Sequence, residues 1–162
     1  MSKGNSILID LEPRGVFREG YIEGTPKPGT IMKVKPAVAI DGTGRHTWIP
    51  YDEAADGDRT TIWVLLEDKL QGKLFTEAYA TGDRARFYAP LPGEHLNVLK
   101  KDLAGTASTD DDYAVGDKLM VDDGTGKLVL TTGNPESEPF IAMEAIVDPT
   151  ADQLVWVEFT GH

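Results

Sequence analysis

The sequence predicts a mostly β protein: a small β-barrel or β-tulip-like domain with long loops, an extended N-terminal arm and little helix. Three observations lead to this fold class. Seventeen glycines and ten prolines divide the 162 residues into short pieces. The pieces between them are rich in β-branched and aromatic residues, which are enriched in strands. Helical spacing is confined to one segment, and many short strands separated by turns are typical of a barrel or a sandwich.

The predicted strands are apolar, β-branched or aromatic runs bounded by turn residues. They cover residues 16–23, 30–35, 46–49, 61–66, 85–89, 96–100, 118–121, 127–131, 140–147 and 154–159. The last of them, LVWVEF, is typical of a strand that is buried on both faces for most of its length.

The helical candidate is the segment 68–79. Its apolar residues recur at three- and four-residue steps, at Leu70, Leu74, Phe75 and Ala78. Gly72 lies inside the segment and costs about 1 kcal/mol relative to alanine in a helix. We therefore expect one or two helical turns there, or an ordered loop.

Two short phrases of sequence occur twice. ATGDR at 80–84 is echoed by AVGDK at 114–118, and DGTGR at 41–45 by DGTGK at 123–127. In the first pair a Gly-Asp turn precedes a predicted strand, and in the second an Asp-Gly step supplies positive φ between strands. These echoes show turn chemistry used twice and are too sparse to establish a repeat fold.

The glycine-rich run that ends in Gly126-Lys127 resembles a phosphate-binding loop. Such a loop requires glycine at position 121 and a hydroxyl residue at position 128, where the chain has Val121 and Leu128. The Asp-Gly step instead predicts a β-hairpin with its turn near residues 123–124. In this hairpin Leu119 and Val121 face Leu128 and Leu130.

Composition excludes several classes of function. The chain has no cysteine, so it forms no disulfide and no thiolate site. Its net charge of −11 disfavours binding to nucleic acid or anionic lipid. No apolar run is long enough to span a bilayer, and the N-terminus lacks the apolar stretch of a secretory signal. We expect a soluble protein that stays in the compartment where it is made.

We find no local signature of catalysis, of cofactor binding or of a metal site. His46, His95 and His162 lie far apart, and the acidic run 110–112 lacks the spacing of a calcium loop. Gly-x-Ser-x-Gly is absent. We expect a binding or structural protein without catalytic, cofactor-binding or metal-ligating residues.

The expected interface is at the N-terminus. Residues 1–15 form a predicted arm, and residues 16–162 form one β-rich domain or two closely packed lobes that divide near residues 92–113. The apolar segment 7–11 adds a strand to its own sheet or to the edge of a neighbour, and the sequence leaves both open. The residues expected at a protein interface are Ile7, Leu8, Ile9, Leu11 and Phe17.

The layout of the chain resembles that of the capsid decoration proteins of tailed bacteriophages, also called cement or head-stabilising proteins. The phrases that carry the resemblance are GYIEGTPKPGTIM at 20–32, VLLEDKLQGK at 64–73, AYATGD at 78–83, YAPLPGE at 88–94, VGDKL at 115–119 and DGTGKL at 123–128. The resemblance implies a β-rich virion protein made in the host cytoplasm, which binds major capsid protein on the outside of the head, across subunit joints. It also implies a homo-oligomer, with a trimer favoured over a dimer, and no catalytic residues.

Two other functions remain open from the sequence. A carbohydrate-binding β module displayed on a virion or cell surface could use Trp48, Trp63 and Trp156 as a sugar platform, although strand tryptophans are more often core. A hydrolase with two carboxylates is the other, and it lacks a local signature.

Overall fold

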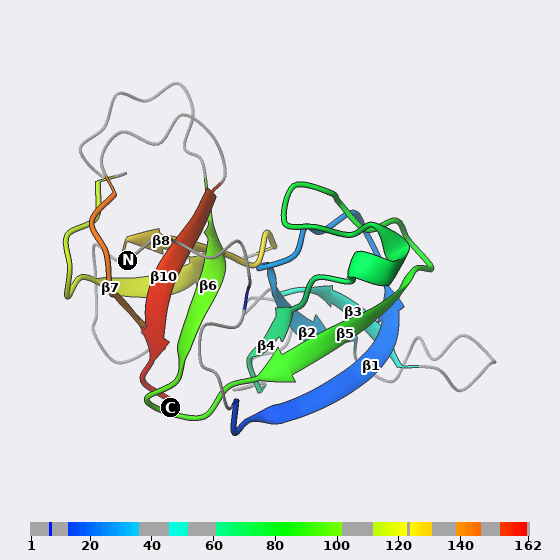
Figure 1. The fold of residues 1–162 in the computed structure, drawn as a ribbon, viewed down its shortest axis with the longest axis horizontal. Coiled ribbons are helices and arrows are strands. Elements are labelled where there is room, and N and C mark those ends of the chain that lie inside the picture. Colours follow the sequence, from blue (N-terminus) through cyan, green and yellow to red (C-terminus); the bar gives the residue numbers. More distant parts are fainter. Residues whose placement is uncertain are drawn as a thin grey trace.

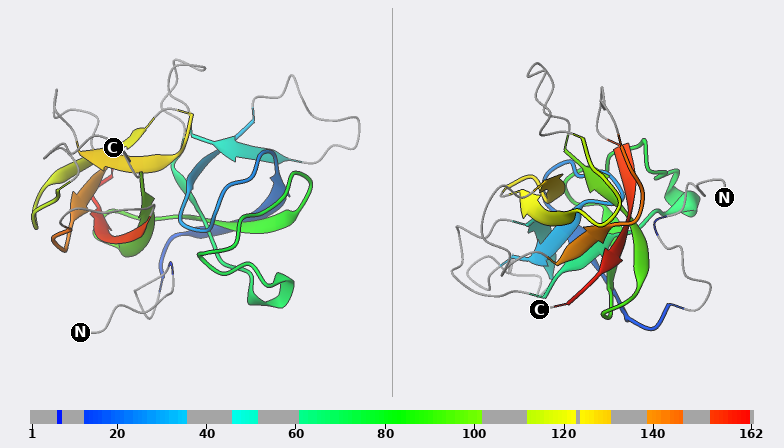
Figure 2. Two further views of the ribbon diagram at one scale, coloured as in Figure 1. Left: turned by 90° about the horizontal axis from the view of Figure 1, so that it is seen from above. Right: turned by 90° about the vertical axis from the view of Figure 1, so that its left-hand side faces the viewer.

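The computed structural model describes residues 7, 13–35, 46–51, 61–101, 112–122, 124–130, 139–146 and 153–161. Within these ranges ten strands form two closed barrels of five strands each. The barrels lie side by side (Figure 1), and a view from above shows them as two neighbouring rings (Figure 2). The prediction of a mostly β, barrel-type fold with little helix is confirmed.

The first barrel has the strand order β1-β3-β2-β4-β5 and the second has the order β10-β6-β8-β7-β9. The chain crosses between the barrels at residues 90–94. The strands of the first barrel are β1 (Val16–Ile22), β2 (Ile31–Val34), β3 (Thr47–Pro50), β4 (Trp63–Leu65) and β5 (Arg84–Ala89). Those of the second are β6 (His95–Lys100), β7 (Lys118–Asp122), β8 (Lys127–Leu130), β9 (Phe140–Ala142) and β10 (Gln153–Phe159).

The two barrels have the same topology. The first strand of each, β1 or β6, pairs in parallel with the third, β3 or β8. Every other pairing is antiparallel and joins the same ordinal strands: second with third, second with fourth, fourth with fifth, and fifth with first. The chain therefore folds the same five-stranded unit twice.

The strand register is also the same in both barrels. β1 meets β3 at Ile22 and Trp48, and β6 meets β8 at Lys100 and Leu128. Following the residue pairings from strand to strand around each barrel gives a consistent set of equivalent positions. The equivalent buried pairs are Ile22/Lys100, Met32/Leu119, Trp48/Leu128, Trp63/Phe140, Leu65/Ala142, Ala85/Val155, Phe87/Val157 and Ala89/Phe159.

Equivalent positions differ in size in a compensating way. Trp48 packs across β1 at Gly20, where a Cβ atom would lie 2.1 Å from the indole nitrogen. The corresponding pair in the second barrel is the smaller Leu128 with the larger Val98. Interiors are close-packed, so a large side chain on one strand requires a small one on its neighbour.

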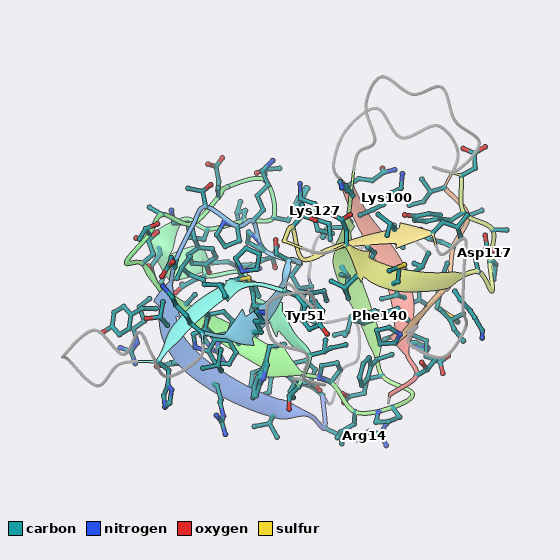
Figure 3. The ribbon with its side chains drawn as sticks, turned by 180° about the vertical axis from the view of Figure 1, so that it is seen from behind. Arg14, Tyr51, Lys100, Asp117, Lys127 and Phe140 are labelled. Carbon is teal, nitrogen blue, oxygen red and sulfur yellow. The ribbon has the colours of Figure 1, made fainter. Side chains whose placement is uncertain are left out.

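β2, β4 and the C-terminal end of β5 are buried on both faces because the second barrel covers their outer side. Side chains alternate along a strand. Met32, Leu65 and Phe87 accordingly fill the first barrel, whereas Ile31 and Val64 belong to the core that continues into the second. Figure 3 shows Phe140 within the second barrel and Tyr51 between the two barrels.

The turn of the β7–β8 hairpin joins the barrels through the backbone. The amide of Ile31 donates to the Gly126 carbonyl at 2.7 Å, and the amide of Gly124 donates to the Tyr51 carbonyl at 2.9 Å. Gly126 has φ +63°, and a Cβ atom there would lie 2.1 Å from the Ile31 carbonyl oxygen. Residues 124–126 thus form the described part of a hairpin turn that docks on β2. The predicted hairpin register is confirmed: Leu119 pairs with Leu130, and Val121 with Leu128.

Each predicted strand overlaps an observed one, and the largest difference is at β9. β9 ends at Ala142, residues 143–144 form a bend, and Ile146 makes an isolated bridge. The expectation of one or two helical turns within 68–79 is confirmed, since the segment contains a single 3₁₀ turn, η2 (Lys69–Gln71). Among the described residues, no helix is long and apolar enough to cross a membrane.

Both Gly-Asp turns precede strands, β5 and β7, as expected. In each, the aspartate carboxylate accepts the amide three residues earlier, from Ala80 to Asp83 at 2.9 Å and from Ala114 to Asp117 at 2.8 Å. The hydrogen bond that the Ala80 amide donates to Asp83 lowers the pKa of this carboxyl. Slight burial acts in the opposite direction, and Lys73 lowers the pKa further.

Candidate protein-interaction surface

The predicted interface residues separate in the structure. Ile7 is buried: its side chain lies in the core shared by the barrels, and its carbonyl accepts the Asn97 amide of β6 at 2.8 Å. Leu8, Ile9 and Leu11 lie outside the described residues. Phe17 is exposed on β1. Of the five, Phe17 is therefore the described residue that is available to a partner.

Phe17 belongs to an exposed strip at the start of β1. The first four residues of the strand, 16–19, are all exposed, including Val16 at 54% and Phe17 at 41%. The Phe17 ring packs on Tyr88 of β5, with centroids 4.8 Å apart. Leu91, in the crossing between the barrels, is also exposed. An ordered aromatic residue beside aliphatic neighbours is typical of a protein-binding surface.

Arginines flank this strip on both faces of the β1–β5 pair. The Arg86 guanidinium lies 5.5 Å from the Phe17 ring centroid, and that of Arg18 lies 5.2 Å from the Trp63 ring. Arg84 pairs with Glu19. A guanidinium that stacks on a ring or pairs with a carboxylate has already lost some conformational freedom. Its side chain therefore loses less conformational entropy when a partner binds.

The strip is cationic in an acidic protein. Four of the six arginines in the chain are Arg14, Arg18, Arg84 and Arg86, against a net charge of −11. We call residues 14–19 of the chain, together with Arg84, Arg86 and Leu91, the arginine strip. Arginine and aromatic residues are enriched where protein interfaces gain most of their binding energy.

A groove of about 480 Å³ lies beside the arginine strip, between β1, β5 and the segment 67–71. Glu19, Arg84 and Arg86 line it from the strands, and Glu67 lines it from the other side. Burial raises the pKa of Glu67, although Lys69 and the amides of Phe75 and Ile7 act in the opposite direction.

A fully exposed leucine stands at the rim of this groove. Leu70 lies on η2 and is 99% exposed. The Asp68 carboxylate caps the turn by accepting the amides of Leu70 and Gln71, and Gly72 ends it in the left-handed region at φ +71°. Leu70 is thus held out into solvent by a capped turn.

The segment that carries Leu70 is fixed to the barrel by side chains. The side-chain amide of Gln71 donates to the Arg84 carbonyl at 3.0 Å, and the Lys73 ammonium pairs with the Asp83 carboxylate at 3.2 Å. The Tyr79 hydroxyl donates to the Leu66 carbonyl at 2.9 Å. Burial, together with nearby carboxylates, raises the pKa of Tyr79, so its hydroxyl stays protonated as a donor.

Glu94 fixes the end of the arginine strip at the crossing between the barrels. Its side chain is 2% exposed and accepts the Tyr88 hydroxyl at 2.6 Å, the Leu91 amide at 2.7 Å and the Arg14 amide at 2.5 Å. Burial raises the pKa of this carboxyl, but the hydrogen bonds from Tyr88, Leu91 and Arg14 outweigh it and leave the pKa below 4.5.

We expect Glu94→Gln to lower the free energy of unfolding by about 2 kcal/mol at pH 7, because the amide nitrogen that replaces one oxygen cannot accept a hydrogen bond. The folded pKa of Glu94 lies below 4.5. Its carboxylate therefore stabilises the fold above that pH and stops doing so as the pH falls through the folded value. The difference between wild type and variant should therefore be smaller in acid, where Glu94 becomes protonated, than at pH 7. Urea unfolding at pH 7 and over a series of acidic pH values measures it, with the exposed Glu77→Gln as control. A difference that stays equal down the whole series would contradict the assignment.

The remaining candidates for chemistry are not brought together. His46 is exposed, and His95 lies beside Glu158 at 3.7 Å. Among the described residues, no group of three or more His, Asp or Glu is placed to hold a metal ion. Trp48 and Trp63 lie in the core of the first barrel, as the burial of strand tryptophans predicts, and so cannot form a sugar platform. Trp156 is half-buried against His95.

Comparison with known proteins finds a solved structure whose likeness covers both barrels. No protein-family model and no curated protein matches the chain. The chain is similar to the crystal structure of the head fiber gp8.5 N base of bacteriophage phi29, with 14% sequence identity and a TM-score of 0.51. The two share a fold. The likeness covers 90% of this chain and 94% of that one, so it includes both barrels.

Sequence reasoning missed most of the arginine strip. Apolar spacing places Leu70 on a helical face, but η2 is too short to have one. The capping pair Asp68 and Gly72, which marks a short turn, is the sequence signal that could have predicted the exposure of Leu70. The arginines give no local signal, because Arg84 reaches Glu19 across 65 positions of sequence.

Proposed function

We propose that this protein is a structural component of a tailed-phage virion that binds the outer surface of the capsid. The observation that carries the proposal is the likeness in fold, over nearly the full length of both chains, to a protein of a phage head fiber. The resemblance of its phrases to capsid decoration proteins supports the same assignment. We further propose attachment to major capsid protein across subunit joints, where many copies acting together stabilise the head.

The chemistry of the surface supports a structural function. The groove beside β5 is lined by paired and exposed charges and by Leu70, which suits contact with another protein. An acidic exterior also avoids adhesion to nucleic acid. We propose that the protein has no catalytic activity, that it is made in the host cytoplasm, and that it acts as a homo-oligomer, with a trimer as the first expectation.

The test is binding to heads of the encoding phage that lack this protein. We expect the purified protein to co-sediment with expanded heads at a saturating ratio and to raise the temperature at which they release DNA. Unexpanded proheads are the control, because their subunit joints differ. The proposal fails if expanded heads bind no protein. Sedimentation velocity of the free protein tests the oligomer.

A further inference from the structure

The equivalence of the two barrels reveals a difference at one strand edge. The shared register makes Glu19 of β1 equivalent to Asn97 of β6, and Phe17 equivalent to His95. In both barrels the residue after the first strand donates to the third strand in the same way. The backbone amide of Glu23 donates to the Trp48 carbonyl at 2.9 Å, and that of Lys101 donates to the Leu128 carbonyl at 3.0 Å.

In the second barrel this edge is occupied by other segments of the chain. The Asn97 amide donates to the Ile7 carbonyl at 2.8 Å, and the Leu99 amide donates to the Gly29 carbonyl at 2.9 Å. Ile7 is thereby buried against β6, at 1% exposure. The edge amides of the repeated unit are therefore satisfied there by carbonyls of other segments, with the apolar side chain of Ile7 buried beside them.

In the first barrel the equivalent edge is open within the described residues. The backbone amides of β1 point alternately to the two neighbouring strands. The Ile22 amide donates to the Asp83 carbonyl on the β5 side, whereas the Tyr21 amide donates to the His46 carbonyl on the β3 side. By this alternation the amides and carbonyls of Phe17 and Glu19 point to the β3 side. The described part of the chain has no β3 residue opposite them, since β3 reaches β1 only at Tyr21 and Ile22. A strand with such an edge is a template for another.

The charge of the arginine strip defines what this edge would accept. Arg18 lies on one face of β1 and Arg86 on the other, each held over a ring. Arg14 precedes the edge and is 66% exposed. A strand that pairs with Phe17 and Glu19 would have an arginine near each face, so acidic side chains suit it, with apolar ones to cover Phe17.

We propose that the edge of β1 at Phe17 and Glu19 binds an extended segment of acidic and apolar residues from a partner protein by strand addition. In the second barrel, the Ile7 carbonyl accepts the amide at the equivalent edge. Strand addition supplies backbone hydrogen bonds for affinity, and flanking side chains supply specificity. The identity of the partner as a capsid protein rests on the proposed function; the edge and its chemistry do not.

The sharpest variant is Glu19→Pro. It removes the one amide of residue 19 that points to the open edge and leaves the β1–β5 hydrogen bonds in place, since proline is tolerated on an edge strand. Glu19→Ala is the matched control, because it loses the pair with Arg84 but keeps the amide. Thermal unfolding of both variants checks that they fold.

With expanded heads, we expect Glu19→Pro to bind at least tenfold more weakly than wild type and Glu19→Ala to bind within about threefold of it. Hydrogen exchange should show residues 16–20 protected on heads. Wild-type binding without protection at 16–20, or equal binding by the proline variant, overturns the edge proposal and leaves the proposed function standing. Protection that rises with protein concentration without heads would identify a second copy as the occupant and overturn the partner assignment.

A peptide separates failure of the edge from failure of the proposed function. The probe is a fluorescein-labelled peptide of residues 6–12, SILIDLE, which combines apolar and acidic residues. Fluorescence anisotropy should show binding to wild type and Glu19→Ala, and at least tenfold weaker binding to Glu19→Pro or of a peptide with Lys in place of both acids. If wild type binds no heads, the proposed function fails and the peptide alone decides the edge. No binding of SILIDLE, or equal binding by all variants, overturns the edge proposal.

Discussion

Replacing Gly126 with alanine is expected to lower the free energy of unfolding by about 3 kcal/mol. The added Cβ atom would lie 2.1 Å from the Ile31 carbonyl oxygen, which is backbone and cannot move aside alone. Overpacking of this kind costs about 1–3 kcal/mol. Separating the hairpin from β2 also weakens the hydrogen bond between the Ile31 amide and the Gly126 carbonyl, a loss of about 1 kcal/mol.

Gly124→Ala is the matched control for this prediction. Gly124 lies in the same turn and also has positive φ, at +76°, but a Cβ atom added there would meet no neighbouring atom within 4 Å. Its substitution should cost about 1 kcal/mol, which is the conformational strain alone. Urea unfolding followed by tryptophan fluorescence measures both variants, and hydrogen exchange at Ile31 should accelerate only in Gly126→Ala. Equal effects of the two substitutions would show that contact with β2 does not stabilise the pair of barrels.

The second large effect is expected at Gly20 and Trp48, where the barrels pack their cores differently. Gly20→Val would place side-chain atoms on the Trp48 indole, since even a Cβ lies 2.1 Å from its nitrogen. Trp48→Leu alone would leave a cavity and lose the stacking on Phe87, whose ring centroid is 4.1 Å away. Each single change should cost about 2–4 kcal/mol.

The double variant Gly20→Val, Trp48→Leu reproduces the pair Val98 and Leu128 of the second barrel. It should be destabilised less than the sum of the single variants by about 2 kcal/mol, because the valine fills space that the indole leaves. A double-mutant cycle from urea unfolding gives this coupling energy directly. Additive effects would mean that the two equivalent sites do not share one packing arrangement. Ile22→Val, which pairs with Trp48 on β3 but leaves Gly20 clear, is the control substitution.

Local chemistry is sufficient to predict the strands and turns. The facing residues of the β7–β8 hairpin are predictable, because Asp-Gly turn preference and alternating leucines and valines both act within a dozen residues. The Gly-Asp turns are predictable for the same reason. The length of η2 is not, since apolar spacing cannot distinguish a buried helical face from a capped turn in which Leu70 faces solvent.

The candidate site is largely beyond reach of the sequence. Phe17 is expected at an interface and is exposed. The arginine strip, however, is assembled by the pairing of β1 with β5, which are distant in the sequence. Ile7 shows the converse. Its apolar character indicates a strand-forming arm, and only its contact with Asn97 shows that it packs on its own chain.

Neighbouring residues are enough to set where this chain extends, where it reverses and which hairpin register it adopts, so these features can be read from the order of amino acids. Closure of the strands into the same five-stranded unit twice emerges only in three dimensions, as does an edge that is covered in one barrel and, among the described residues, open in the other. Those outcomes depend on pairings between segments far apart in the chain. No residue type encodes such a pairing, so it becomes visible only when the strands are placed side by side.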